Sequence, residues 1–258
     1  MPLSQYFQLM DVQARMALRA DASRFYLGYL WWLLEPLLWV GVFYLVFSVI
    51  LKSRQDDFLI FLMCGKLTFI WFSKAVSQAS NSIVASRGLI AKLDIPKSLF
   101  PMSVVQESLY KQAAAFILLF VVLVVFGFAP SGTWWWLVPI ILVNYLMIVA
   151  CALVGASLVC IVRDFSMLIP LGMTFLLFTS GIFWNVHDLG DPAKTELVLA
   201  LNPIAFILDC YRQALMWNTV PDLSHLALVA LGAVLLIGGM LALMRRSSQY
   251  LALKALTA

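Results

Sequence analysis

The chain has 258 residues, of which 63% are hydrophobic and 12% charged, whereas a soluble domain usually carries about a quarter charged residues. An apolar excess of this size is larger than an aqueous core can enclose, so it excludes an ordinary soluble globular protein. The net charge of +4 comes without any block of basic residues, and we therefore expect no nucleic-acid partner.

The first 24 residues predict a helix that lies on the membrane surface. Polar residues share one helical face and apolar residues share the other, which is typical of an interfacial amphipathic helix. The two faces are formed by Gln8, Asp11, Arg15 and Arg19, and by Phe7, Met10, Ala14 and Leu18. We expect this interfacial helix within 1–24 and no cleavable signal peptide, because five charged residues precede the first apolar run.

Six apolar runs follow, each close to the roughly 20 residues that a helix needs to cross a membrane. We therefore predict an all-α membrane protein in which residues 1–258 form a single transmembrane domain. The six transmembrane helices are expected at about 33–51, 58–77, 112–129, 134–162, 165–184 and 226–244. The second run is the only one that contains lysines, at Lys66 and Lys74.

Two connections between these runs predict further helices. Residues 85–101 mix charged and apolar side chains and contain Pro96 and Pro101, so we expect a short exposed coupling helix there. In the outer loop, 185–225, an apolar stretch is too short to cross the membrane and is broken between Asn202 and Pro203. This pattern predicts two short re-entrant helices.

The distribution of basic residues predicts the orientation of the chain. Six spans place both termini on one side, and that side carries ten lysines and arginines against four on the other. We therefore expect both termini and residues 85–101 in the cytoplasm. The ten are Arg15, Arg19, Arg24, Arg87, Lys92, Lys97, Arg163, Arg245, Arg246 and Lys254, and the four are Lys52, Arg54, Lys194 and Arg212.

An aromatic cluster leads into the first span. Eight aromatic residues lie within 25–44, and Glu35 stands among them directly before Pro36. These rings either anchor the chain at the membrane interface or line a path along which sugar rings slide, and composition leaves both interpretations open. The residues of such a glycan path are Phe25, Tyr26, Tyr29, Trp31, Trp32, Glu35 and Trp39.

No residue pattern predicts catalysis or a metal centre. A Gly-Lys pair is followed by Leu67, where a phosphate-binding loop needs serine or threonine. His187, Asp188 and Asp191 could ligate a metal, but polar residues that mark a turn are far commoner. The four cysteines show neither a disulfide framework nor zinc-site spacing. We expect no catalytic residue, no metal and no cofactor in this chain.

Two segments carry a more specific pattern. Residues 24–38 read RFYLGYLWWLLEPLL, and residues 81–97 read NSIVASRGLIAKLDIPK. They are similar to the LGxLW…L(N/E)P stretch and to the cytoplasmic loop of the membrane subunits of type-two ABC exporters for bacterial polysaccharides. The resemblance covers nearly the whole chain, with two departures: Arg87 stands where a small polar residue is usual, and Lys66 lies in a segment that is usually uncharged.

The resemblance implies the permease half of an ATP-driven exporter in the bacterial cytoplasmic (inner) membrane. The chain would form a homodimer, work with two separate ATPase subunits that bind the ATP, and move a lipid-linked polysaccharide such as an O antigen or a capsular glycan. It would not itself be an enzyme. The resemblance also implies that the cytoplasmic segment couples to the ATPase through Arg87, Leu89, Lys92, Asp94 and Lys97.

Three alternatives stay open at this point. An ABC exporter of drugs or small lipids would have a less aromatic segment before its first span. An intramembrane glycosyltransferase would need an acidic metal site better formed than Asp188 and Asp191. An ion-coupled flippase would carry paired charges deep in several spans, whereas the third to sixth expected spans have no charge at their centres.

Overall fold

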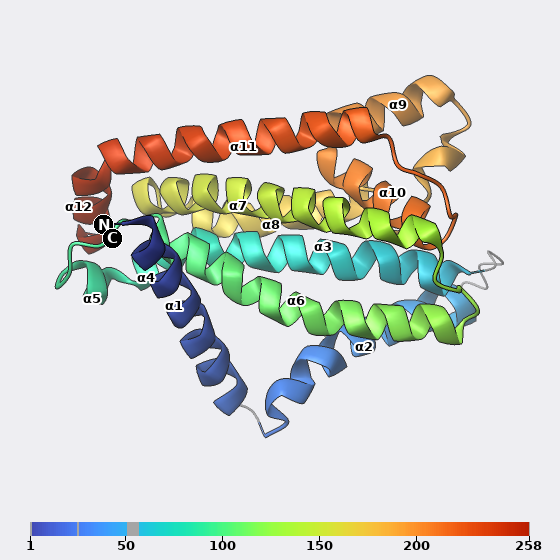
Figure 1. The fold of residues 1–258 in the computed structure, drawn as a ribbon, viewed down its shortest axis with the longest axis horizontal. Coiled ribbons are helices and arrows are strands. Elements are labelled where there is room, and N and C mark those ends of the chain that lie inside the picture. Colours follow the sequence, from blue (N-terminus) through green and yellow to red (C-terminus); the bar gives the residue numbers. More distant parts are fainter. Residues whose placement is uncertain (1, 25, 51–56, 258) are drawn as a thin grey trace.

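The computed structural model describes residues 2–24, 26–50 and 57–257. In these residues the secondary structure consists of helices and connecting turns, which confirms the all-α prediction. Figure 1 shows the long helices lying side by side along one axis, with both chain termini at one end. We name that end the terminal end, and we name the opposite end, where residues 180–203 turn, the loop end.

The helices differ widely in length. In chain order they are α1 (Leu3–Ser23), η1 (Gly28–Leu30), α2 (Trp31–Tyr44), η2 (Leu45–Ile50), α3 (Phe58–Ser80), α4 (Ser82–Ala85), α5 (Arg87–Ile90), α6 (Leu99–Val125), η3 (Gly132–Trp136), α7 (Leu137–Ile161), α8 (Phe165–Thr179), η4 (Val186–Leu189), α9 (Pro192–Leu201), α10 (Pro203–Leu215), α11 (Leu223–Arg246) and α12 (Ser248–Thr257). Among the described residues, α3, α6, η3 with α7, and α11 are long and apolar enough to cross a membrane.

The first and fifth expected spans are less regular than predicted. α1 and Gly28–Val42 pass the same test only together, and they meet at 98°, so they count at most as one broken span; residue 51, the predicted end of the first span, lies outside the described residues. α8 has 15 residues rather than the 20 of 165–184, a length of roughly 22 Å against the roughly 30 Å of a hydrocarbon core. The structure therefore supports four or five spans by length and composition, and the count of six is not confirmed.

The third span begins earlier than predicted. α6 starts at Leu99 rather than near residue 112, so Glu107 and Lys111 lie inside the helix. These two side chains are one turn apart, and their charged atoms are 2.8 Å from each other. An oppositely charged pair with this spacing stabilises a helix, so the charges do not end it.

Residues 85–101, which were predicted to lie in the cytoplasm, do not form the single helix that was expected. One helical turn ends at Ala85, α5 covers only Arg87–Ile90, and the next helix begins at Leu99. Pro96 restricts Ile95 to extended conformations, which explains why helix does not continue through the middle of the segment. The expected coupling helix is therefore limited to α5.

The break predicted between Asn202 and Pro203 is confirmed. α9 ends at Leu201 and α10 begins at Pro203. The Asn202 side chain caps α10, because its Oδ1 accepts hydrogen bonds from the backbone N–H groups of Ile204 and Ala205, both at 3.1 Å. The re-entrant placement of the two helices in a membrane stays a prediction.

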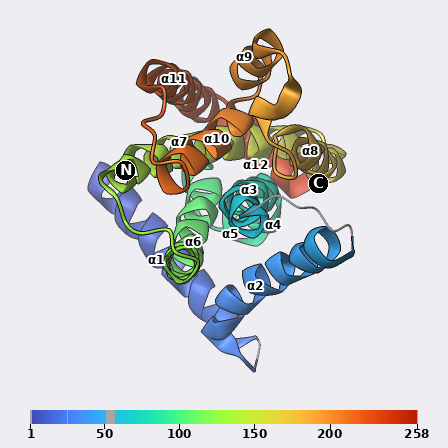
Figure 2. The same ribbon diagram turned by 90° about the vertical axis from the view of Figure 1, so that its right-hand side faces the viewer.

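α3 forms the centre of the bundle. Figure 2 looks along the bundle and shows α3 surrounded by α2, α6, α7, α8 and α10. One close contact between α3 and α7 depends on a glycine: a Cβ atom at Gly155 would lie 2.1 Å from Ser80 Oγ. That hydroxyl donates a 2.7 Å hydrogen bond to the carbonyl of Val76 within α3. The two helices therefore have no room for a methyl group at this point.

We predict that Gly155→Ala lowers the free energy of unfolding by roughly 1–3 kcal/mol, because it overpacks the contact between α3 and α7. Ser80→Ala in the same chain should recover part of the loss, since the new Cβ would then meet the Cβ of residue 80 at 3.1 Å instead. Gly172→Ala on α8 is the control, because no neighbouring atom of the described residues lies within 4 Å of its Cβ position. Equal melting temperatures for the two glycine variants in detergent would contradict the packing argument.

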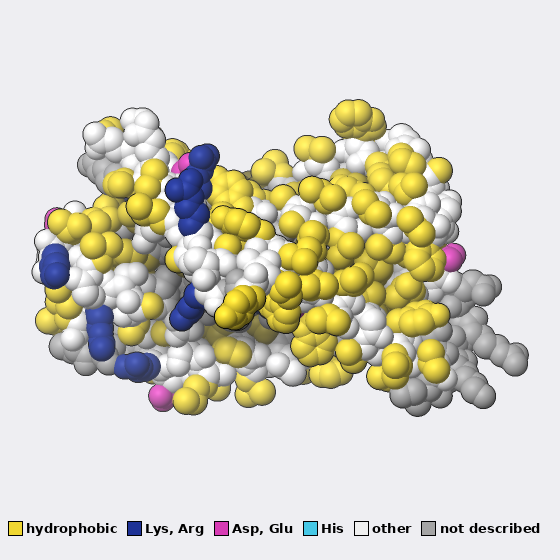
Figure 3. Space-filling view, turned by 90° about the horizontal axis from the view of Figure 1, so that it is seen from below, with side chains coloured by type: hydrophobic (Ala, Val, Ile, Leu, Met, Phe, Trp, Pro, Cys, Tyr) yellow, Lys and Arg dark blue, Asp and Glu magenta, His cyan; other side chains and the backbone are white. Residues whose placement is uncertain are grey.

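The surface of the bundle is mostly apolar. Figure 3 shows hydrophobic side chains along this face of the molecule and the lysines and arginines gathered toward the terminal end. The basic end is the one that the predicted orientation puts in the cytoplasm. Lys52 and Arg54, two of the four basic residues expected on the other side, lie outside the described residues.

Candidate functional site

The predicted path residues lie on α2 and at the bend before it. Trp31, Trp32, Glu35 and Trp39 all belong to α2, and Tyr29 belongs to η1. Two further positions were predicted in the bend. Tyr26 is fully exposed there, and Phe25 lies outside the described residues.

Trp31, Trp32 and Glu35 line a cavity of about 270 Å³ between α1, α2, α3 and α6. Trp71 of α3 adds a third indole to its wall, so we name it the tryptophan cavity. The ring of Tyr29 packs edge-on against Trp32, with ring centroids 5.0 Å apart. The structure thus brings three of the seven predicted residues into one space and places a fourth beside them.

Two ion pairs join the helices around the tryptophan cavity. Glu35 of α2 pairs with Lys74 of α3, and Lys111 of α6 pairs with Asp21 of α1 at 2.7 Å. Partial burial disfavours the charged form of Asp21, but its contact with the Lys111 ammonium outweighs that effect and lowers the pKa of Asp21. The cavity wall therefore holds opposite charges that are matched in pairs.

Trp39 lies in a different space, a groove of about 220 Å³ between α2, α3 and α8. The ammonium of Lys66 is 5.7 Å from the centroid of the Trp39 ring, a cation–π contact. Lys74 lines both this α2–α8 groove and the tryptophan cavity, so the two spaces adjoin along α3. Four of the seven predicted path residues therefore line two adjoining spaces.

At the terminal end, four of the five predicted coupling residues line two pockets. Arg87 shares a pocket of about 370 Å³ with Arg163 and Ser166 at the junction of α7 and α8. Lys92, Asp94 and Lys97 line the second pocket, of about 390 Å³, against α12.

Burial separates these coupling residues further. Leu89 is 40% exposed, and Arg87, Lys92 and Asp94 are exposed as well. Lys97 is only 4% exposed, and its ammonium donates a 3.0 Å hydrogen bond to the carbonyl of Ile95. Lys97 therefore holds the loop before α6 in place and offers little surface to a partner.

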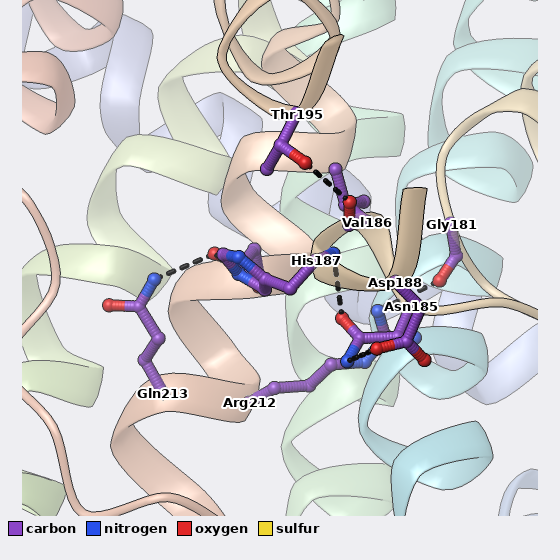
Figure 4. A network of polar contacts seen from close by, with 9 residues as sticks. Gly181, Asn185, Val186, His187, Asp188, Thr195, Arg212 and Gln213 are labelled. Atoms are coloured by element: carbon purple, nitrogen blue, oxygen red, sulfur yellow. Dashed lines mark hydrogen bonds and ion pairs between the residues drawn. The ribbon is translucent and has the colours of Figure 1, made fainter. Parts of the chain in front are cut away.

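A polar network that the sequence analysis did not assign ties the loop end together (Figure 4). Asp209 of α10 is 1% exposed; His187 Nε2 lies 3.0 Å from its Oδ1, and Gln213 Nε2 donates to its Oδ2 at 2.6 Å. Arg212, equally buried, donates from Nη1 to the carbonyl of Gly181 at 2.8 Å. The network holds the chain that follows α8 against α10.

The sequence contained a signal for this network. Asp209 and Arg212 are charged residues three positions apart in a mostly apolar helix, a spacing that makes them neighbours on one helical face. His187 and Asp191, considered above as metal ligands, have structural contacts instead: His187 meets Asp209, and Asp191 caps α9 by accepting from the N–H of Ala193 at 3.0 Å. In the described part of the chain, no three His, Cys, Asp or Glu residues are grouped to hold a metal ion.

A family of known proteins matches this chain from within α1 to the end of α10. The family described as ABC-2 type transporter matches residues 8–216. The O-antigen export system permease protein RfbA of Myxococcus xanthus is 29% identical over 240 residues, which is 91% of this chain and 90% of that protein. A protein of the same name from Klebsiella pneumoniae is 25% identical over 84% of each chain. The polysialic acid transport protein KpsM of Escherichia coli is 25% identical over 83% of this chain and 84% of its own.

Proposed function

The chain belongs to the ABC-2 type transporter family, and we propose that it is the permease subunit of an exporter for a lipid-linked polysaccharide such as an O antigen or a capsular glycan. The observation that carries this proposal is the nearly end-to-end similarity to relatives named as O-antigen export permeases and as a polysialic acid transport protein. The aromatic residues of α2 agree with it, because indole rings suit a sugar substrate.

In this proposal the chain pairs with a second copy and with two ATPase subunits, which bind and hydrolyse the ATP. α8 supports the pairing: no residue of this helix is buried within the single chain. Met167, Leu171 and Phe175 are each more than 60% exposed. Because α8 is also short for a lipid-exposed span, a second copy of the chain would cover it better than lipid does.

The glycan path in this proposal follows α2. It begins at Tyr26 and Tyr29 and continues past Trp31, Trp32 and Glu35 in the tryptophan cavity. It then passes Trp39 in the α2–α8 groove. Movements of the ATPase subunits reach these helices through α5 and residues 91–98, which carry Arg87, Leu89, Lys92 and Asp94. Arg87 connects the ATPase to these helices most directly, because the pocket that Arg87 lines also includes Ser166 at the start of α8.

Deleting the gene tests the proposed function. The deletion strain should lose its surface polysaccharide and accumulate the lipid-linked glycan inside, and the tagged permease should co-purify with an ATPase subunit from the complemented strain. Normal surface polysaccharide in the deletion strain would refute the assignment.

The proposed orientation, with both termini on the cytoplasmic side of the inner membrane, has its own test. Ala193 and Gly88 are both exposed, at the loop end and the terminal end. Ala193→Cys should react with a membrane-impermeant maleimide applied to intact cells, whereas Gly88→Cys should react only after the membrane is opened. Cys64, Cys160 and Cys210 are buried and should give little background. The opposite labelling pattern would invert the topology and with it the coupling argument.

A further inference from the structure

We propose that the tryptophan cavity is a binding subsite for one neutral sugar ring of the exported glycan, and that Gln112 on α6 is the residue that recognises the hydroxyl groups of this ring. The inference rests on the proposed function, since it names a part of the permease that holds the substrate. It adds a specificity-determining residue that lies outside the aromatic segment.

The first observation is an unpaired donor. Gln112 is 5% exposed and lines the tryptophan cavity, and its buried Nε2 has no hydrogen-bond partner among the residues that the structure describes. A buried amide that makes no hydrogen bond destabilises the fold, so such groups are rare unless a ligand or water completes them. A hydroxyl oxygen of a bound sugar supplies the acceptor that Gln112 lacks.

The second observation is the composition of the wall. Trp31 and Trp32 of α2 and Trp71 of α3 line the cavity around Gln112. The Trp71 Nε1 already donates to Ser108 Oγ at 3.2 Å, so this indole is fixed in orientation. Flat apolar rings combined with a few placed polar groups suit the C–H face and the hydroxyl edge of a pyranose.

The third observation is the charge balance. The cavity wall contains two carboxylates, Asp21 and Glu35, and two ammonium groups, Lys74 and Lys111. They are joined in the two ion pairs described above. A phosphate or an ammonium group would have to compete with these pairs, whereas a neutral ring can accept and donate hydrogen bonds at their edges. The cavity therefore favours a neutral sugar over a charged lipid headgroup.

The position of the cavity gives the subsite its role. Its walls come from α1, α2, α3 and α6, and the two ion pairs link α1 to α6 and α2 to α3. A sugar bound between Trp32 and Gln112 contacts both α2 and α6 close to the bend that follows α1. Occupancy of the subsite thus stabilises the arrangement of the interfacial helix and the first span around the beginning of the path.

Gln112→Leu separates this role from a structural one. The variant keeps the side-chain volume and removes the unpaired donor, so its melting temperature should stay equal to wild type or rise. Surface glycan per inserted permease should nevertheless fall about tenfold, because the sugar loses its hydrogen bond to the amide. Gln106→Leu is the matched control: Gln106 is on the same helix, accepts a 3.1 Å hydrogen bond from Tyr145 outside the cavity, and should leave export per molecule unchanged.

Direct binding is measured on the purified permease–ATPase complex by its tryptophan fluorescence, since three indoles line the cavity. The probes are a lipid-free oligosaccharide released from the surface polysaccharide of the same strain, and glycerophosphoethanolamine as a headgroup mimic. The oligosaccharide should change the emission, with about tenfold weaker binding to Gln112→Leu. A response to glycerophosphoethanolamine alone would overturn the sugar assignment.

Unchanged export by Gln112→Leu, in a strain whose deletion mutant lacks surface glycan, would overturn the subsite and leave the proposed function intact. Normal surface glycan in the deletion mutant itself would instead refute the proposed function. The two failures are therefore distinguishable.

Discussion

Replacing Trp31 and Trp32 together by leucine is expected to reduce surface glycan per inserted permease to less than a tenth of the wild-type value. Both rings line the tryptophan cavity, which the proposed path enters after Tyr26 and Tyr29. Stacking on an aromatic side chain is worth about 1–3 kcal/mol per ring for nucleic-acid bases, a loose analogue for sugars. Loss of two rings therefore removes about 2–6 kcal/mol, and each 1.4 kcal/mol corresponds to roughly a factor of ten in binding.

The measurement is surface polysaccharide normalised to permease in the membrane fraction. Trp135→Leu serves as the control, because Trp135 is 80% exposed at the loop end, far from the cavity. Phenylalanine at positions 31 and 32 keeps the rings and should preserve most export. If the double leucine variant exports like wild type once its amount is corrected, the two tryptophans only anchor the chain at the interface, and the path interpretation is wrong.

Three of the apolar runs coincide with helices long enough to cross a membrane, because the thickness of the membrane sets the length of such runs. The expected spans 58–77, 134–162 and 226–244 correspond to Phe58–Ser80, Gly132–Ile161 and Leu223–Arg246. The start of α6 was missed because its charges are compensated, by the pairing of Glu107 with Lys111 inside the helix and by a residue far away in the chain. Lys111 pairs with Asp21, 90 positions earlier in the chain, and a local count of charges cannot detect such a pair.

Contacts between residues far apart in the chain also limit what the sequence reveals about the candidate site. The aromatic segment was visible in the sequence because its residues are consecutive, and Trp31, Glu35 and Trp39 repeat every fourth position on one helical stripe. The sequence did not reveal that α2 passes α6 at Trp31 and α8 at Trp39. Side chains of one helical stripe therefore line both the tryptophan cavity and the α2–α8 groove. Gln112 was missed because an amide in an apolar helix is distinctive only when its surroundings are known.

Reversing the charge of both Arg87 and Lys92 to glutamate is expected to abolish export while the permease still inserts and the ATPase still hydrolyses ATP. Both side chains are exposed at the terminal end, in neighbouring pockets on the face that the proposed orientation presents to the ATPase. Charges at the edge of an interface select and orient the partner, and juxtaposed like charges cost several kcal/mol. Exposed charges contribute little to folding, so the amount of inserted protein should change little.

The control for this reversal is Lys194→Glu, because Lys194 is 69% exposed at the loop end and should not meet the ATPase. Lys97 is unsuited to the same test: it is buried against the carbonyl of Ile95, and reversing its charge would disturb the loop before α6. Export and ATP hydrolysis are measured on the same membranes, so that uncoupling is distinguished from loss of assembly. Wild-type export by the Arg87 and Lys92 double variant would exclude this segment as the coupling element, whereas loss limited to the Lys194 variant would place the ATPase at the loop end and reverse the topology.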